Sequence, residues 1–133
     1  MSTYYQTNVV YEKLDEEGNP KNVRESYLVD AMSCTEVESI VIKELNLNLE
    51  VSNVRKTNIS ELFNRDVEGF YYSCRLAMIV TADNGKDKRI PVLIYVKAKD
   101  VKDAESFVVG ELKKSMQTWV VVSITETRII DVL

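Results

Sequence analysis

Residues suited to a buried face alternate with polar residues in two parts of the chain. One run extends over Tyr5–Tyr11 and the other over Tyr72–Val80. A period of two residues is typical of a β-strand with one buried side. The same alternation returns over residues 23–31 and 90–98, so each run is expected to be followed by a second strand.

The segments between these strands have the composition of tight turns. Gly18 and Gly85 stand among Asn and Asp residues, and we expect both glycines to adopt a positive φ.

A helix is predicted after the second strand of each segment, because apolar residues then recur at intervals of three and four. Thr35 and Glu38 fit a capping box at the start of the first helix, and Asp100 begins the second in a looser way. The apolar stripes consist of Val37, Ile40, Val41 and Leu45, and of Ala104, Phe107, Val108 and Leu112. A third strand closes each segment.

The two segments are related as copies of one motif. Residues 4–45 align without a gap on residues 71–112 at a constant offset of 67, and 11 of the 42 pairs are identical. About two or three identities would arise by chance. Beyond the helix the second copy has three extra residues, and the alignment resumes at an offset of 70, with Thr57 matched to Thr127. This self-similarity predicts a tandem duplication.

The expected fold is α+β, as one domain over residues 1–133 with two ββαβ copies at about 4–59 and 71–130. Residues 60–69 are expected to form a linking loop. Because the crossover helix makes strands two and three parallel, strand one can lie antiparallel between them. Joining the third strands gives a mainly antiparallel six-stranded sheet in the order 2-1-3-3′-1′-2′, with both helices on one face. Pro91 suits a sheet edge, since it lacks an amide donor.

Charge and composition narrow the class of protein. The 133 residues carry a net charge of −4 with a pI near 5.0, which disfavours strong nonspecific binding to DNA. Neither a signal peptide nor an apolar stretch of membrane-spanning length is found in the sequence, so we expect a cytoplasmic protein that does not bind membranes. Cys34 and Cys74 are expected to be buried free thiols.

Three stretches of the chain carry a family resemblance: Val9–Lys13, Tyr27–Ser33 with the following Thr35 and Glu36, and Glu126–Val132. Together they resemble a domain family of unknown function from gut bacteria and their phages, over nearly the whole chain. The resemblance implies a single intracellular domain. It supplies no activity, cofactor or catalytic residue.

Signatures of catalysis are missing from the sequence. Without histidine, the chain has no Ser-His or Cys-His pair, and it has no P-loop, G-x-G-x-x-G or C-x-x-C motif. We therefore predict no catalytic residue, no cofactor and no metal site. Glu44 and Glu111 recur at the margin of the apolar stripes. They are interpreted first as partners of nearby Lys or Arg, and second as a paired acidic ligand site.

The sheet face away from the predicted helices differs between the copies. In the second copy it is expected to carry Ala77, Ile79, Leu93, Tyr95, Val120, Val122 and Ile124. The first copy has polar residues such as Gln6, Asn8 and Ser26 at equivalent places. Because burying apolar surface is worth about 25 cal/mol per Å², we expect a second subunit or a partner protein to cover this face. The predicted function is a non-enzymatic binding or assembly module that forms homo-oligomers or docks a protein partner.

Two other functions stay open at this point. One is an accessory protein that binds single-stranded nucleic acid, with Tyr4 or Tyr71 stacking on a base near Arg75. The other is a protein that sequesters a small ligand or signal molecule at a subunit interface.

Overall fold

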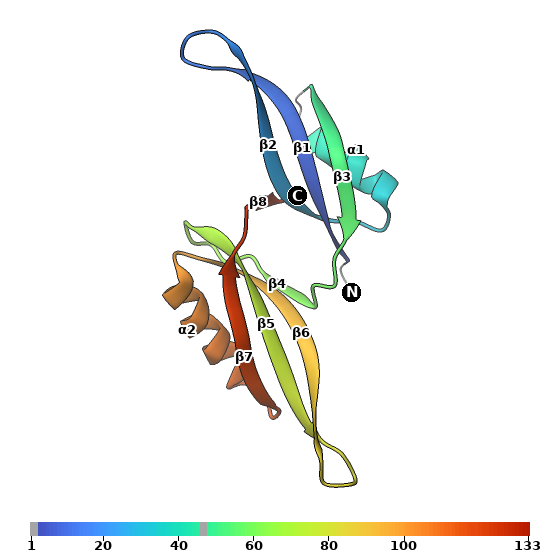
Figure 1. Ribbon diagram of the computed structural model, residues 1–133, viewed down its shortest axis with the longest axis vertical. Helices are drawn as coiled ribbons and strands as arrows, with labels where there is room; N and C mark the ends of the chain where they lie inside the picture. The colour runs from blue at the N-terminus through green and yellow to red at the C-terminus, as the bar shows by residue number, and fades with distance from the viewer. Residues whose placement is uncertain (1–2, 46–47) are drawn as a thin grey trace. The chain divides into compact units, whose positions relative to one another are not determined.

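The computed structural model describes residues 3–45 and 48–133, and within them the chain forms eight strands and two helices (Figure 1). These elements belong to two compact units. Unit 1 comprises the described residues up to Asn58 together with Arg128–Leu133, and unit 2 comprises Ile59–Thr127. The fold is α+β, as predicted.

Unit 1 contains one helix and a four-stranded sheet in the order β3-β1-β2-β8. Its central strands are β1 (Tyr4–Leu14) and β2 (Pro20–Asp30), which pair antiparallel to each other. The helix α1 (Cys34–Leu45) is followed by β3 (Leu49–Lys56), which lies antiparallel to β1. The short strand β8 (Ile129–Val132) pairs with β2 in the parallel direction.

Unit 2 has the corresponding sheet, in the order β4-β6-β5-β7. Its central strands β5 (Phe70–Thr81) and β6 (Asp87–Ala98) form an antiparallel pair. The helix α2 (Val101–Leu112) leads to β7 (Thr118–Glu126), which is antiparallel to β5. The short strand β4 (Glu61–Phe63) pairs with β6 in the parallel direction.

The two short strands are exchanged between the sequence copies. β4 follows the first copy along the chain but belongs to the sheet of unit 2, while β8 follows the second copy but belongs to unit 1. Both use the same register. Tyr27 pairs with Asp131 in unit 1, and Ile94 pairs with Glu61 at the equivalent place in unit 2.

The chain is held in the same way just before each of these short strands. The amide and the hydroxyl of Thr57 donate to the carbonyl oxygen of Tyr4 at 2.9 and 2.7 Å. The amide and the hydroxyl of Thr127 donate to the carbonyl oxygen of Tyr71 at the same two distances. The matched bonds explain why the chain leaves both sheets at equivalent positions.

The order 2-1-3 predicted within each copy is confirmed, as β2-β1-β3 and β6-β5-β7, but the predicted joining of the two copies into one six-stranded sheet is wrong. The third strands, β3 and β7, belong to different sheets, and each sheet carries one helix instead of sharing a face with two. The predicted ββαβ copies, 4–59 and 71–130, also leave out β4, which lies inside the expected loop 60–69. A strand of three residues is too short for its alternation to be recognised in a sequence.

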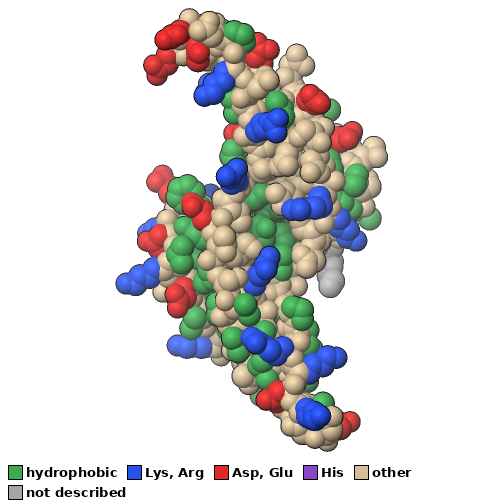
Figure 2. All heavy atoms as spheres, viewed as in Figure 1, with side chains coloured by type: hydrophobic (Ala, Val, Ile, Leu, Met, Phe, Trp, Pro, Cys, Tyr) green, Lys and Arg blue, Asp and Glu red, His purple; other side chains and the backbone are tan. Residues whose placement is uncertain are grey.

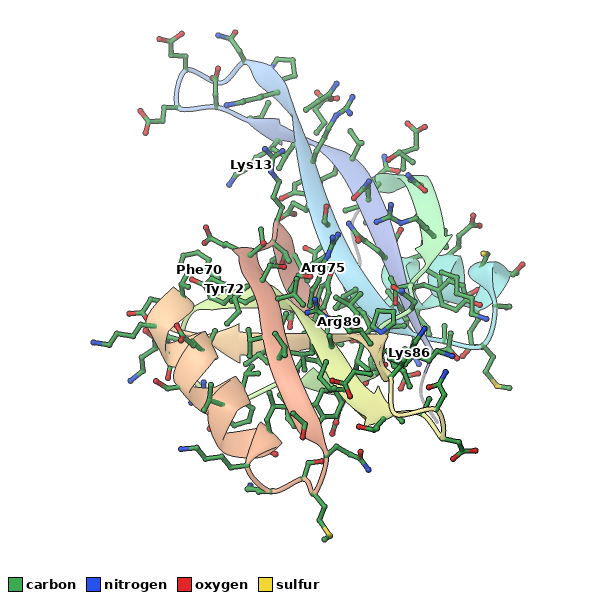
Figure 3. The ribbon with its side chains drawn as sticks, turned by 60° about the horizontal axis from the view of Figure 1, so that its bottom comes forward. Lys13, Phe70, Tyr72, Arg75, Lys86 and Arg89 are labelled. Carbon is green, nitrogen blue, oxygen red and sulfur yellow. The ribbon has the colours of Figure 1, made fainter. Side chains whose placement is uncertain are left out.

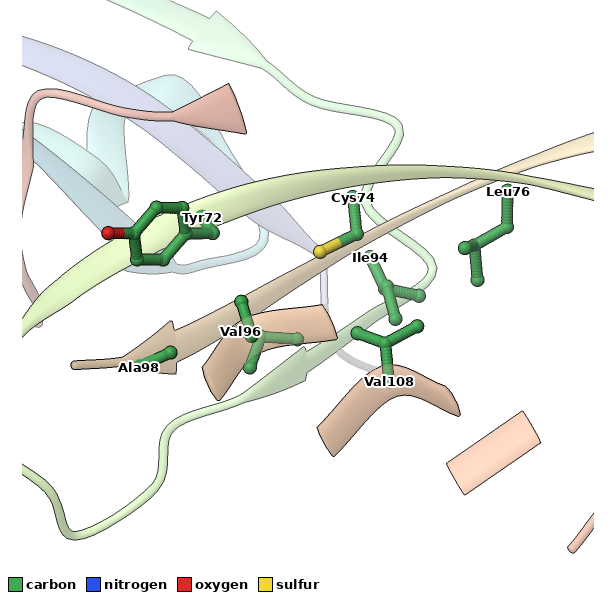
Figure 4. Close-up of a cluster of buried hydrophobic side chains, with 8 residues drawn as sticks. Tyr72, Cys74, Leu76, Ile94, Val96, Ala98 and Val108 are labelled. Carbon is green, nitrogen blue, oxygen red and sulfur yellow. The ribbon is translucent and has the colours of Figure 1, made fainter. Parts of the chain in front are cut away.

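A hydrophobic core lies between the helix and the sheet of each unit. Figure 4 shows the core of unit 2, where Val108 of α2 faces side chains of β5 and β6. Its buried members are Tyr72, Cys74, Leu76, Ile94, Val96, Ala98, Ala104 and Val108. Those of unit 1 are Tyr5, Val9, Tyr27, Val29, Ala31, Val37 and Val41. Phe63 of β4 packs against the core of unit 2, and Leu133 at the chain end packs against that of unit 1.

The start of α1 differs from the prediction by two residues. The hydroxyl of Ser33 accepts the amide hydrogen of Glu36 at 3.1 Å, and the Glu36 carboxylate accepts that of Met32 at 3.2 Å. The capping box is thus Ser33 with Glu36, and the predicted box of Thr35 with Glu38 is wrong. Because the helix begins at Cys34, Thr35 already lies within its first turn.

The hairpin turns have the predicted geometry. Gly18 and Gly85 have φ values of 83° and 81°. In both hairpins the glycine amide donates to a carbonyl three residues earlier, that of Asp15 or Ala82. The prediction that Pro91 lies in an edge strand is wrong, because β6 lies between β4 and β5. Pro91 is tolerated because it lies in the part of β6 that extends beyond β4, where its missing amide hydrogen removes no bond to that strand.

Candidate functional site

One side of the unit 2 sheet faces α2, and the other side carries the residues predicted to form an interface. Cross-strand partners share a sheet face. Arg75 pairs with Leu93 and Ile79 pairs with Arg89, and none of these four residues belongs to the core beneath α2. We call this side the helix-free face of unit 2. Its residues are Ser73, Arg75, Ala77, Ile79, Arg89, Leu93, Tyr95 and Val120.

The predicted interface residues differ in how much of each side chain is accessible. Ala77 is buried, whereas Ile79, Leu93 and Tyr95 are half-buried. Val120, which pairs with Ala77, is 40% exposed. These residues lie on the helix-free face, and their role at an interface stays a prediction.

Ile124 does not lie on this face. The register of β5 with β7 shifts between Arg75 and Leu76, which leaves Val122 as an extra residue in β7. Such a bulge reverses the alternation beyond it. Ile124 consequently pairs with Cys74 and packs against the core of unit 2, so its predicted place on the helix-free face is wrong. Val122 stands at the bulge and is exposed.

The equivalent face of unit 1 is more polar, although it also carries Leu28, which pairs with Gln6 and is fully buried. The hydroxyl of Ser26 donates to Oδ1 of Asn8 at 2.7 Å, and Nη2 of Arg55 donates to Oε1 of Gln6 at 3.0 Å. Position 79 of unit 2 corresponds to Glu12, which is exposed. The two sheets therefore share a fold but present different chemistry on their helix-free faces.

The residues predicted to contact nucleic acid lie in different environments. Tyr71 is buried, its hydroxyl donates to Oδ1 of Asn64 at 2.8 Å, and Nζ of Lys97 lies 5.6 Å from its ring centroid. The ring surface that a nucleobase would need is covered, contrary to the prediction. Tyr4 is half-buried and Arg75 is exposed. Figure 3 labels Arg75 together with Arg89, the second exposed cation of the helix-free face.

The hairpin tips of the two units carry different charges. Figure 2 shows acidic side chains gathered at the tip of the β1–β2 hairpin, which contains Asp15, Glu16 and Glu17. The β5–β6 hairpin instead carries Lys86, Lys88 and Arg89 beside its two aspartates. A polyanion would be attracted more to the second hairpin than to the first.

An ion pair fixes the start of α2. Nη1 of Arg65 lies 3.1 Å from Oδ2 of Asp103, and its guanidinium carbon lies 4.5 Å from the ring centroid of Phe107. The same Asp103 oxygen accepts the amide hydrogen of Lys99 at 3.0 Å. The pKa of the Asp103 carboxyl is lowered, first by the hydrogen bond from the Lys99 amide and second by the hydrogen bond from Arg65. These contacts have a structural explanation, because they cap the helix whose first amides Asp100 also satisfies.

Three ionisable side chains of unit 1 interact on the helix side of its sheet. The pKa of Tyr27 is raised to about 12, mainly by burial and secondly by the negative charge of Glu25. A hydrogen bond to Glu25 is the first cause of the raised pKa of Tyr11. Both phenols are thus held in their neutral, donating form around one carboxylate.

The cysteines are free, but only one of them is buried. Burial raises the pKa of the Cys74 thiol to about 11, as expected for a core residue. Cys34 is exposed at the start of α1, so the prediction that both thiols are buried is wrong for Cys34.

Two searches of the described residues bear on the class of protein. Among residues 3–45 and 48–133, no group of three or more Cys, Asp or Glu is arranged to hold a metal ion. Neither α1 nor α2 is long and apolar enough to cross a membrane.

Comparison with known proteins identifies the family of the chain and no individual relative. Residues 3–133 match the family described as domain of unknown function (DUF4494), and the chain belongs to this family. No curated protein and no solved structure matches the chain.

Proposed function

We propose that this member of the family is a non-enzymatic binding module of the cytoplasm that assembles through the helix-free face of unit 2. The partner is a second copy of the chain. The supporting observation is the contrast between equivalent positions of the two units. Ile79 and Leu93 stand where unit 1 has Glu12 and Ser26, and the fold imposes no such difference.

The chemistry of the face suits a protein surface better than water. Ala77, Ile79, Leu93 and Tyr95 adjoin across β5 and β6. Burial of apolar area drives association at about 25 cal/mol per Å². A standard interface needs about 800 Å² from each partner, and the half-buried Ile79, Leu93 and Tyr95 would form its centre, since Ala77 is already buried. Val120 would contribute further apolar area, and Arg89 would lie toward the rim, where charges are tolerated. Arg75 lies opposite Leu93 within the patch, so its charge would need a partner across the interface.

The test is the molar mass in solution, measured by light scattering after size exclusion over a range of concentrations. We expect the wild type to form dimers, and Ile79→Glu to shift them to monomers. The strand can accept this change, because unit 1 has Glu12 at the same place. Ile42→Glu, the same change at a residue of α1 that is 57% exposed, is the matched control and should leave the mass unchanged. A wild type that is monomeric at every concentration would overturn the proposal.

A second candidate is binding of single-stranded nucleic acid. Two exposed arginines, Arg75 and Arg89, lie on the helix-free face, and the acidic residue of this face in the register of β5 with β6 is Asp87, at the hairpin end. Cations of this kind attract phosphates, and binding should weaken steeply with salt.

A fluorescence anisotropy titration with a labelled single-stranded oligonucleotide tests the second candidate. The expected outcome is binding at low salt that is lost in the double variant Arg75→Gln/Arg89→Gln and retained in Lys13→Gln, which changes a cation of the other unit. Absence of binding by the wild type at low salt removes this candidate.

A further inference from the structure

The helix side of unit 2 contains a pocket of about 250 Å³ at the C-terminal end of α2. Its floor consists of apolar side chains from the two central strands, Leu76, Val92 and Ile94. Leu112 and Glu111 of α2 line one part of the wall, and β4 and Trp119 line others. A pocket of this size is smaller than those for drug-sized ligands, which run from about 300 to 1,000 Å³. It suits a small molecule with an apolar body.

The charged residues of the lining are all acidic. Glu61 and Glu111 contribute carboxylates, and neither Lys nor Arg is among the residues that line the pocket. Nζ of Lys114 lies 2.9 Å from Oε1 of Glu111, but the Lys114 side chain is 74% exposed, against 29% for Glu111. An ion pair with such an exposed partner contributes little to stability. A ligand cation can therefore take the place of Lys114 beside Glu111 at low cost.

The indole of Trp119 is held at the pocket by its own hydrogen bond. Its Nε1 donates to the hydroxyl of Ser115 at 3.1 Å, and both residues line the pocket. Ser115 lies in the connection between α2 and β7, where the second copy has its three extra residues. The face of an indole ring attracts cations more strongly than that of any other side chain.

The equivalent place in unit 1 has larger and more polar side chains on its central strand β2, and lacks the tryptophan. Glu25 and Tyr27 stand where unit 2 has Val92 and Ile94, and Leu49 stands where unit 2 has Trp119. Tyr27 is buried against the core of unit 1. The apolar floor and Trp119 are thus specific to unit 2, whereas the two acidic residues of the lining have acidic equivalents in unit 1, Glu44 and Asp131.

We propose that this pocket binds a small organic ammonium compound, with its apolar body on the strand residues and its cation between the carboxylates and Trp119. This inference goes beyond the proposed function, because it uses the opposite side of the same sheet. The two can fail independently, since pocket binding does not depend on the oligomeric state.

Trp119 is the only tryptophan of the chain, so its fluorescence reports on the pocket directly. The probes are 2-phenylethylammonium, the neutral 2-phenylethanol and the anionic phenylacetate, which share one apolar body. We expect the ammonium probe to change the fluorescence of Trp119 in a saturable way. The alcohol should bind at least about tenfold more weakly, and the acid should not bind. Equal binding of the alcohol, or no saturation by the ammonium probe up to about 10 mM, would overturn the proposal.

Substitutions that retain Trp119 locate the binding. Glu111→Gln should lower the affinity for the ammonium probe about tenfold. Lys114→Gln removes the competing cation and should strengthen binding about threefold. Glu44→Gln, the same change at the equivalent position of unit 1, is the control and should have no effect. If Glu111→Gln and Glu44→Gln bind the probe alike, the assignment to this pocket is wrong.

Discussion

Unit 1 and unit 2 share a strand order and a register, but they differ at most positions outside the core. Val29 and Val41 are fully buried in unit 1, as are their equivalents Val96 and Val108 in unit 2. Several residues on the helix-free faces differ in size and charge, as do Val92 and Ile94 of the pocket from Glu25 and Tyr27. The comparison indicates that the core positions specify the fold, and that the remaining positions are free to carry a different function in each unit.

The comparison also reveals that neither unit is made from one sequence copy alone. Phe63, which follows the first copy, packs on the core of unit 2, and Leu133, which follows the second, packs on that of unit 1. A change in Phe63 should therefore destabilise unit 2, and a change in Leu133 should destabilise unit 1, most of which lies at the other end of the sequence.

The largest effect is expected from Phe63→Ala and Leu133→Ala. Phe63 also contacts Phe107 edge to face, with ring centroids 5.1 Å apart. We expect Phe63→Ala to lower the free energy of unfolding by about 3 kcal/mol, and Leu133→Ala by about 1–2 kcal/mol because the chain end can relax. Hydrogen exchange measured by mass spectrometry should show lost protection in unit 2 for the first variant and in unit 1 for the second.

Phe70→Ala is the control for this pair, because Phe70 is 53% exposed and should contribute little. Protection lost in unit 1 after Phe63→Ala would contradict the exchange of short strands.

A smaller effect is expected at alkaline pH in unit 1. Since the pKa of Tyr27 rises from 10.0 to about 12 on folding, its contribution to stability is complete below pH 10 and is lost as the pH rises through 12. Tyr27→Phe should reduce the decrease in the free energy of unfolding over this pH range. Urea unfolding between pH 9 and 12 measures it, with Tyr95→Phe on the helix-free face of unit 2 as the control. Equal pH dependence in wild type and Tyr27→Phe would contradict the assignment.

At acidic pH the sensitive element is the start of α2 in unit 2. The lowered pKa of Asp103 means that its contribution is present above 3.8 and is lost as the pH falls through the lowered value. Asp103→Asn should remove this pH dependence, whereas Glu36→Gln at the equivalent cap of α1 should not. Thermal unfolding measured from pH 2 to 5 distinguishes the two, and identical profiles for Asp103→Asn and wild type would contradict the prediction.

The smallest effect concerns the two helices. Gly110 of α2 corresponds to Lys43 in α1, and a Cβ added at Gly110 would meet no atom within 4 Å. Gly110→Ala should therefore raise the free energy of unfolding by about 0.5–1 kcal/mol. Gly85→Ala is the contrasting control, because its φ of 81° strains any residue with a side chain. A destabilised Gly110→Ala measured by urea unfolding would contradict the prediction.

Local patterns in the sequence were sufficient to predict the α+β class, the six long strands, both helices and the glycine turns. Each of these depends on neighbours within a few residues, where periodicity and backbone preference act directly. The sequence also predicted that Ala77, Ile79 and Leu93 lie on one face of the second copy, because this follows from the alternation along two strands.

Only the tertiary structure decided which strands share a sheet and what surrounds each site. β8 pairs with β2 across about a hundred residues, and strands of three or four residues leave no periodic signal in the sequence. The bulge at Val122, which turns Ile124 into the core, depends on the hydrogen bonding of β5 with β7. The pocket beside Trp119 likewise exists because of how side chains from β4, α2 and the sheet fill space together, and packing of that kind is a property of the folded chain.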